Sequence, residues 1–269
     1  MTSWDFFALS AVLLLGVPHG GLDGAIARRN GWPQGLIPWF LFHLSYIFLG
    51  TAVALFWWFF PLAGLIGFLF ISALHFGASD TADVKAMEPS ILPWIAHGGL
   101  VSIVIPNLQP TLVEPIFTLL VGANNAELLM SYLAILFIPW SLSLLAYMIF
   151  TYKRRQYRKP LINLIVQLIL VTLLPPLISF SLYFCFWHSK GHLLRLWRSL
   201  AISERRRNLT EAAIYTLMAW LTMGFVFYYF QAAFSETVIK VIFIGLAALT
   251  LPHMLLVDYA DRRNNMGKK

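Results

Sequence analysis

Charged residues are scarce in this sequence. Asp, Glu, Lys and Arg together make up 12% of its 269 residues, whereas an ordinary soluble domain has about 25%. Cys185 is the only cysteine, which excludes a disulfide framework and a cysteine-based metal site. No Lys or Arg precedes Arg28, and no small-residue cleavage site follows the first apolar run. We therefore expect that run to remain as a helix rather than to be removed as a signal peptide.

Apolar residues are correspondingly abundant, at 59% of the chain. About 20 apolar residues are enough for a helix to span the hydrocarbon core, so we predict an all-α fold, a polytopic transmembrane helix bundle of about seven to nine spans. Residues 1–269 should form a single transmembrane helical domain. The predicted spans are residues 4–27, 36–59, 62–82, 91–106, 128–151, 160–174, 177–201, 211–232 and 237–258.

Prolines mark the two irregular parts of this plan. Pro175 and Pro176 cannot continue a regular helix, because proline lacks the backbone N–H and clashes with the preceding turn. The long apolar run that contains them is therefore split there. Segment 107–127 holds Pro110, Pro115 and Gly122, which predicts a loop with room for a re-entrant or interfacial piece.

The distribution of basic residues predicts the orientation. The net charge of +7 does not indicate nucleic acid, because the basic residues lie in short loops between apolar runs, as in membrane proteins that follow the positive-inside rule. With the N-terminus outside, nine crossings place these loops and the C-terminus in the cytoplasm. Any count with the same parity gives this placement, and seven crossings are possible if the two shortest segments are not spans. We expect a multi-pass protein of the inner (plasma) membrane.

Histidines are the main candidates for chemistry, because ionisable residues at membrane depth are costly and usually functional. His188 and His192 are four residues apart, which places both rings on one face of a regular helix. This spacing favours two ligands of one metal ion, and the alternatives are a proton-relay pair and simple packing. His19 and His75 complete a predicted set of four ligands, although both could instead be helix-end residues in headgroup water. Four imidazoles suit Zn, Cu, Fe or Ni.

Other residues are expected to surround this metal. Asp23 follows His19 by four positions and Asp80 follows His75 by five, so each carboxylate could accept the second ring N–H of its histidine and fix the tautomer. His253 is expected to contact a metal ligand rather than the metal itself. The alternatives are direct ligation as a fifth ligand and a structural role in which a backbone carbonyl caps the ring. For His43 and His97 we expect only hydrogen bonds to a helix or a place near the interface.

Aromatic side chains close to the predicted metal suggest an apolar slot for a long hydrophobic substrate drawn from the lipid. The residues expected to line it are Phe76, Phe180, Tyr183, Phe184 and Trp187. For most other aromatic residues, packing and interfacial belts are the simpler explanation.

Four motifs in this order resemble the Brp/Blh family of bacterial and archaeal membrane β-carotene 15,15′-dioxygenases. They are Pro-His-Gly-x-x-Asp at His19, Leu-His-Phe-Gly-x-x-Asp at His75, Phe-Trp-His-x-x-x-His at His188 and Pro-His-x-x-x-x-Asp at His253. The first motif departs from the family pattern, in which a histidine often follows the aspartate, because Gly24 occupies that position here.

The resemblance implies a non-heme Fe(II) centre held by His19, His75, His188 and His192, at which O2 cleaves β-carotene to retinal. It also implies a functional link to a rhodopsin. The main alternative is a transporter of divalent metal ions or protons that uses the same buried His and Asp residues. A non-catalytic scaffold or retinal-handling protein is the third. Transport needs a polar path across the whole membrane, and the outer half of each predicted span is nearly all apolar.

Overall fold

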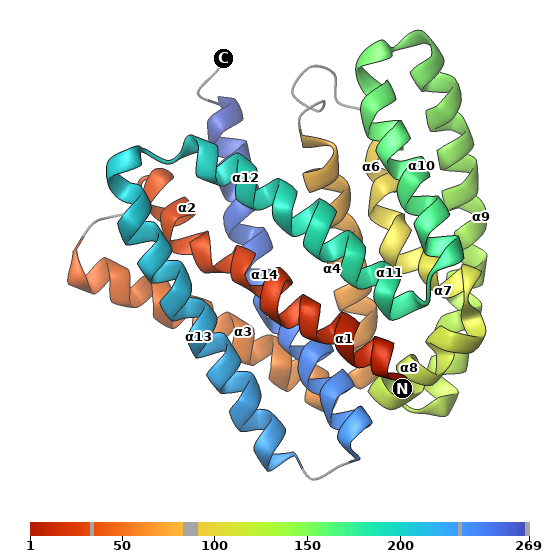
Figure 1. The fold of residues 1–269 in the computed structure, drawn as a ribbon, viewed down its shortest axis with the longest axis horizontal. Helices are drawn as coiled ribbons and strands as arrows, with labels where there is room; N and C mark the ends of the chain where they lie inside the picture. Colours follow the sequence, from red (N-terminus) through yellow and green to blue (C-terminus); the bar gives the residue numbers. More distant parts are fainter. Residues whose placement is uncertain (33–34, 83–90, 231–232, 267–269) are drawn as a thin grey trace. The chain divides into compact units, whose positions relative to one another are not determined.

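The computed structural model describes residues 1–32, 35–82, 91–230 and 233–266, with the backbone alone for 258–266. Regular structure in these ranges is entirely helical (Figure 1), which confirms the predicted fold class. The helices of the first half are α1 Ser3–Ala11, η1 Val12–Gly16, η2 Val17–Leu22, α2 Asp23–Arg29, α3 Leu36–Phe59, α4 Pro61–Asp80, α6 Ile91–Gly99, η3 Leu100–Val104, α7 Ile105–Leu108 and α8 Pro110–Val121. Those of the second half are α9 Ala123–Lys153, η4 Arg155–Tyr157, α10 Arg158–Leu173, α11 Pro176–Leu182, η5 Tyr183–Ser189, α12 Lys190–Ser199, η6 Ile202–Glu204, α13 Arg205–Tyr229 and α14 Phe234–Met266.

Seven helical stretches in the described residues are long and apolar enough to cross a membrane, as expected of a multi-pass membrane protein. They are Ser3–Arg29, Leu36–Phe59, Pro61–Asp80, Ile91–Leu108, Ala123–Lys153, Ile202–Tyr229 and Phe234–Val257. The predicted spans 160–174 and 177–201 are not among them. The first corresponds to α10, which has 16 residues, fewer than the approximately 20 that a span needs. The second contains Lys190 and two histidines, which make it less apolar.

Proline acts differently at the two positions singled out in the sequence. The break at Pro175–Pro176 is confirmed, because α10 ends at Leu173 and α11 begins at Pro176. The loop predicted for 107–127 is wrong for most of that segment, because α8 occupies it, and the re-entrant or interfacial piece predicted there stays a prediction. Pro110 is the first residue of α8, where the missing N–H costs nothing because the first turn has no intrahelical acceptor for it. Gln109 and Gly122 alone separate α8 from its neighbours.

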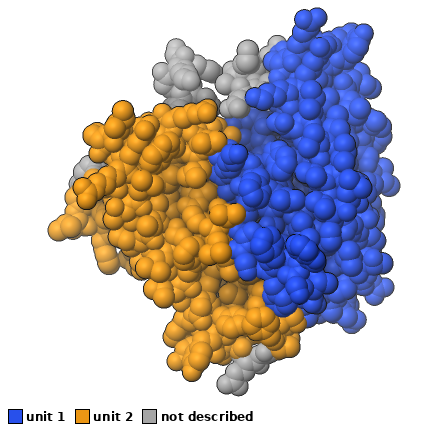
Figure 2. All heavy atoms as spheres, viewed as in Figure 1, with its two compact units in different colours: residues 1–11, 65–191 blue, residues 12–64, 192–269 orange. Residues whose placement is uncertain are grey.

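The described chain forms two compact units, which Figure 2 shows in separate colours. Unit 1 comprises residues 1–11 and 65–191, and unit 2 comprises residues 12–64 and 192–269. The prediction of a single domain therefore stays a prediction.

Close packing of two helices organises unit 1. A Cβ atom added to Gly77 on α4 would collide with the carbonyl of Trp94 on α6, and one added to Gly98 on α6 would collide with the carbonyl of Ala73. Trp94 donates a hydrogen bond from Nε1 to the carbonyl of Leu74 at 3.1 Å. Small residues thus let the two backbones approach closely, as is usual between membrane helices.

Unit 2 packs α14 against α3, and η2 against α13. Gly21 makes the second contact possible, since a Cβ atom there would lie 2.8 Å from the carbonyl oxygen of Ala212. A Cβ atom on Gly20 would meet nothing within 4 Å, so Gly21, and not its neighbour Gly20, makes the close contact with α13.

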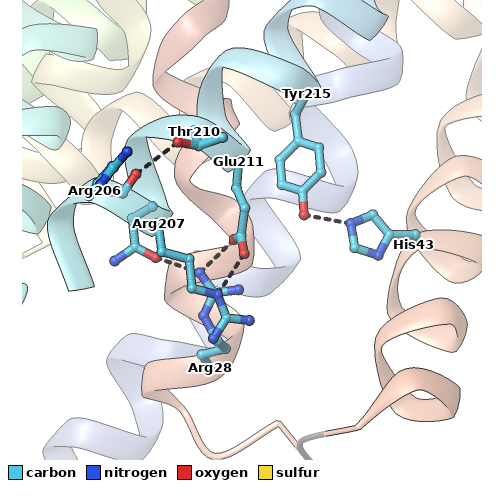
Figure 3. A network of polar contacts seen from close by, with 8 residues as sticks. Arg28, His43, Arg206, Arg207, Thr210, Glu211 and Tyr215 are labelled. Carbon is cyan, nitrogen blue, oxygen red and sulfur yellow. Dashed lines mark hydrogen bonds and ion pairs between the residues drawn. The ribbon is translucent and has the colours of Figure 1, made fainter. Parts of the chain in front are cut away.

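A polar network ties the end of the first span to α13 in the same unit (Figure 3). Arg28 pairs with Glu211 at 2.6 Å and donates to Oδ1 of Asn208 at 2.5 Å. Its guanidinium lies 5.0 Å from the ring centroid of Trp39. Arg28 is therefore held in a largely buried ion pair.

Departures from α-helical geometry occur at two of the candidate histidines. The segments η1, η3 and η5 are π-helical and η2 is a 3-10 helix. His19 lies in η2 and His188 lies in η5, whereas His75, His192 and His253 lie in α4, α12 and α14. Single π-helical turns inside α-helices occur frequently at functional sites, and the π-helical geometry of η5 at His188 fits that pattern.

Candidate metal centre

Three buried histidines come together in unit 2. The ring centroids of His19 and His253 are 5.0 Å apart, those of His192 and His253 are 5.1 Å apart, and those of His19 and His192 are 5.9 Å apart. Each pair of rings is nearly perpendicular, with interplanar angles of 74–88°. They come from η2, α12 and α14, so three segments distant in sequence supply one cluster of imidazoles.

Asp23 anchors this cluster through a partner other than the one predicted. Nδ1 of His253 donates to Oδ1 of Asp23 at 2.7 Å, and the Tyr46 hydroxyl donates to the other carboxylate oxygen at 2.7 Å. Asp23 was expected to accept the second ring N–H of His19. The carbonyl of Gly16 accepts the N–H at Nδ1 of His19 instead. Gly16 ends the π-helical turn and His19 follows in a 3-10 turn, so the local backbone is not the regular helix that the spacing assumed.

The tautomers of two of these histidines follow from their acceptors. An oxygen acceptor at Nδ1 requires the proton on that nitrogen, which leaves the lone pair of the neutral ring on Nε2. Histidines that bind metals commonly have this arrangement, with a carboxylate or carbonyl accepting the second N–H. His19 and His253 therefore both have the hydrogen-bond pattern of Nε2 ligands.

A second pair of candidate ligands lies in unit 1. The rings of His75 and His188 have centroids 4.9 Å apart and an interplanar angle of 72°, and both side chains are buried. The prediction that His188 and His192 lie on one helix face assumed a regular α-helix. The helix is instead π-helical up to Ser189 and α-helical from Lys190 onward. Because the four predicted ligands divide two and two between the units, their convergence on one ion stays a prediction.

Asp80 holds a tyrosine and faces a histidine that sequence reasoning did not select. The hydroxyl of Tyr183 donates to Oδ2 of Asp80 at 2.9 Å, and Nδ1 of His97 lies 3.8 Å from the same oxygen. His97 is only 2% exposed. It belongs to a different helix, 17 positions after Asp80, so no local spacing could have revealed the pair. His43, in contrast, bonds to the carbonyl of Trp39 in its own helix at 2.7 Å, as expected.

Most of the predicted lining residues gather around His188. The ring of Phe76 lies 4.7 Å from that of His188, and Phe184 stacks on His188 with an interplanar angle of 14°. Phe76 also contacts Tyr183 at 5.1 Å, and Phe180 stacks on Phe184 at 5.5 Å. All are buried except Trp187, which is half-buried.

The donor chemistry of these clusters suits a metal ion. Imidazole nitrogens lie about 2.0–2.1 Å from a zinc ion, so rings that share an ion have centroids roughly 5 Å apart. The separations in unit 2 are close to this value. As the side chains stand, no group of three or more His, Cys, Asp or Glu in the described residues has the arrangement to hold an ion, so the rings would have to turn to bind one.

The position where the chain departs from the Brp/Blh motif has a steric explanation. A Cβ atom on Gly24 would lie 2.9 Å from the ring of Trp39 and 3.3 Å from that of Tyr215. The Trp39 ring, which also contacts Arg28, fills the space that a larger side chain at residue 24 would need.

Comparison with known proteins gives consistent matches over nearly the whole chain. A family described as beta-carotene 15,15′-dioxygenase matches residues 10–261. A beta-carotene 15,15′-dioxygenase of uncultured marine bacterium 66A03 is 35% identical over 271 residues, covering 96% of this chain and 94% of the relative. A probable beta-carotene 15,15′-dioxygenase Blh of Halobacterium salinarum is 24% identical over 294 residues, covering 94% and 83%. No solved structure matches.

Proposed function

Because the chain belongs to the beta-carotene 15,15′-dioxygenase family, we propose that it cleaves the central double bond of β-carotene with O2. One carotenoid and one O2 give two molecules of retinal, which balances the reaction. The observation that carries this proposal is the family match over residues 10–261, a range that contains every candidate histidine. Retinal as the product suggests a functional link to a rhodopsin.

The proposed cofactor is ferrous iron, with His19, His75, His188 and His192 as ligands. Iron when bound would supply the position at which O2 is activated. Two features of the chain support this choice: the candidates are buried imidazoles, which suit iron, and Nδ1 of His19 already meets a carbonyl acceptor. A four-imidazole set would leave positions open for O2.

The aromatic residues around His188 would serve as the walls of the substrate slot. β-Carotene is long, rigid and uncharged, so it dissolves in the hydrocarbon core, and a site for it must be apolar and narrow. Phe76 and Phe184 are buried against the ring of His188, where they would hold a polyene beside the metal and keep water out. Tyr183 belongs to the same wall, and its hydroxyl is directed to Asp80.

The proposed location is the inner (plasma) membrane, with the N-terminus outside and the C-terminus in the cytoplasm. The basic residues that orient the chain lie at the ends of spans, at Arg28, Lys153 and Arg205, and basic loops stay on the cytoplasmic side.

Expression in bacterial cells that accumulate β-carotene tests the proposal. The unaltered chain should bleach the cells and yield retinal, identified by chromatography, while the His188→Ala, His192→Ala double variant should leave the carotenoid intact. Intact carotenoid in cells that contain the folded, iron-loaded protein would reject the proposed activity.

A further inference from the structure

We infer that His253 is a direct metal ligand, the third imidazole of a set with His19 and His192, and that Asp23 and Tyr46 hold it in place. The inference rests on the proposed function for the identity of the metal, and adds a ligand to the four histidines proposed above.

The position of the ring supports direct ligation. His253 lies closer to both other imidazoles than they lie to each other, at centroid distances of 5.0 and 5.1 Å against 5.9 Å. All three rings belong to unit 2. A residue that only hydrogen-bonded to a ligand would be expected to contact one of the two other histidines, whereas His253 contacts both His19 and His192.

The hydrogen bond on the opposite side of the ring also points to a ligand. Nδ1 of His253 donates to a carboxylate that is itself only 3% exposed. A carboxylate in this position fixes the neutral tautomer with its lone pair on Nε2 and increases the basicity of that nitrogen. Hydrogen bonds therefore connect the Tyr46 hydroxyl, the Asp23 carboxylate and the His253 imidazole in that order.

The backbone around His253 is held in place as well. Tyr46 is on α3 and also lies 3.5 Å from the carbonyl of Leu249 on α14, one turn before His253. A Cβ atom on Gly50, one turn after Tyr46, would lie 3.0 Å from the carbonyl of Ala248. The close contact between α3 and α14 thus fixes the position of His253 relative to α3, as a preorganised ligand requires.

Cobalt(II) binding to the purified full-length protein provides the test, because the visible absorption of cobalt(II) reports the number and kind of its ligands. Protein stripped with a chelator is titrated with cobalt(II), and bound metal is also measured by elemental analysis. His253→Gly should change the visible spectrum and raise the dissociation constant more than 10-fold, and added imidazole should restore the spectrum. Tyr46→Phe should weaken binding less, with the spectrum of the wild type.

His43→Gly is the matched control, since His43 belongs to the same unit but bonds to Trp39 and Tyr215. It should bind cobalt(II) like the wild type. If His253→Gly does not fold, His253→Gln should show the same loss. An unchanged spectrum and affinity in the folded His253 variant, or no cobalt(II) binding by the wild type, overturns the inference. Metal binding that depends on His253 in a protein that yields no retinal would overturn the proposed function alone.

Discussion

Nδ1 of His253 donates a hydrogen bond to Oδ1 of Asp23 at 2.7 Å, across 230 positions of the sequence. This bond joins the last span to the end of the first, in the interior of one compact unit. The bond brings the carboxylate of the first motif into contact with the histidine of the last motif, although the two motifs are far apart in the sequence.

The role of Asp23 can be tested by Asp23→Asn, which keeps the shape of the side chain but removes its charge. An amide can present its NH2 group to Nδ1 and thereby favour the wrong tautomer, so metal affinity should fall roughly 10–100-fold without loss of folding. Metal titration of the folded variant measures this. Affinity equal to that of the wild type would show that the carboxylate does not orient a ligand.

Packing of the first motif on α13 predicts different effects for two adjacent glycines. Gly21→Ala places a Cβ atom 2.8 Å from the carbonyl oxygen of Ala212, and such overpacking typically costs about 1–3 kcal/mol. Gly20→Ala meets no neighbour within 4 Å and should leave the melting temperature unchanged. Thermal unfolding in detergent compares the two variants, and equal melting temperatures would contradict the close approach of η2 to α13.

The Arg28–Glu211 pair should contribute measurably to stability. Glu211→Gln removes the charge that faces a largely buried guanidinium, and hydrogen bonds to charged groups contribute about 1.5–3 kcal/mol; partial exposure of both side chains favours the lower end. Glu204 is exposed, so Glu204→Gln should change stability by less than about 0.5 kcal/mol. Equal thermal shifts in the two variants would mean that the ion pair adds nothing to folding.

The aromatic residues near His188 should determine where cleavage occurs. Phe184 stacks on His188, whereas Phe186 on the same helical segment is 51% exposed. Phe184→Leu should slow cleavage or shift it to a neighbouring double bond while iron content stays normal, and Phe186→Leu should behave like the wild type. Chromatography of the aldehydes distinguishes these outcomes. The same product from both variants at the same rate would remove Phe184 from the slot.

Much of this architecture could be predicted from the sequence, because membrane helices leave long apolar runs and buried histidines stand out within them. His75 and His188 do lie together, as do His19 and His192. The errors arise where contacts are not local. Spacing along one helix suggested His19 as the partner of Asp23, but a π-helical and a 3-10 turn alter the geometry, and the partner lies on α14.

His97 shows the same limit, since its proximity to Asp80 depends on the packing of α6 against α4 through Gly77 and Gly98. Pro110 shows another, because proline signals both a loop and the first turn of a helix.

The basic loops predict the orientation of the chain in the membrane. Reporter fusions after Lys159 and after Lys269 should both report the cytoplasm, because either seven or nine spans leave an even number between these points. Reports from opposite sides would show that the span count is wrong by one.

The most direct test of the account is the stoichiometry of cleavage by the purified, iron-loaded protein supplied with β-carotene and O2. Central cleavage predicts two retinal molecules for each β-carotene consumed, with no other aldehyde, and no turnover once a chelator has removed the iron. Intact β-carotene, or two aldehydes of unequal length, would contradict it.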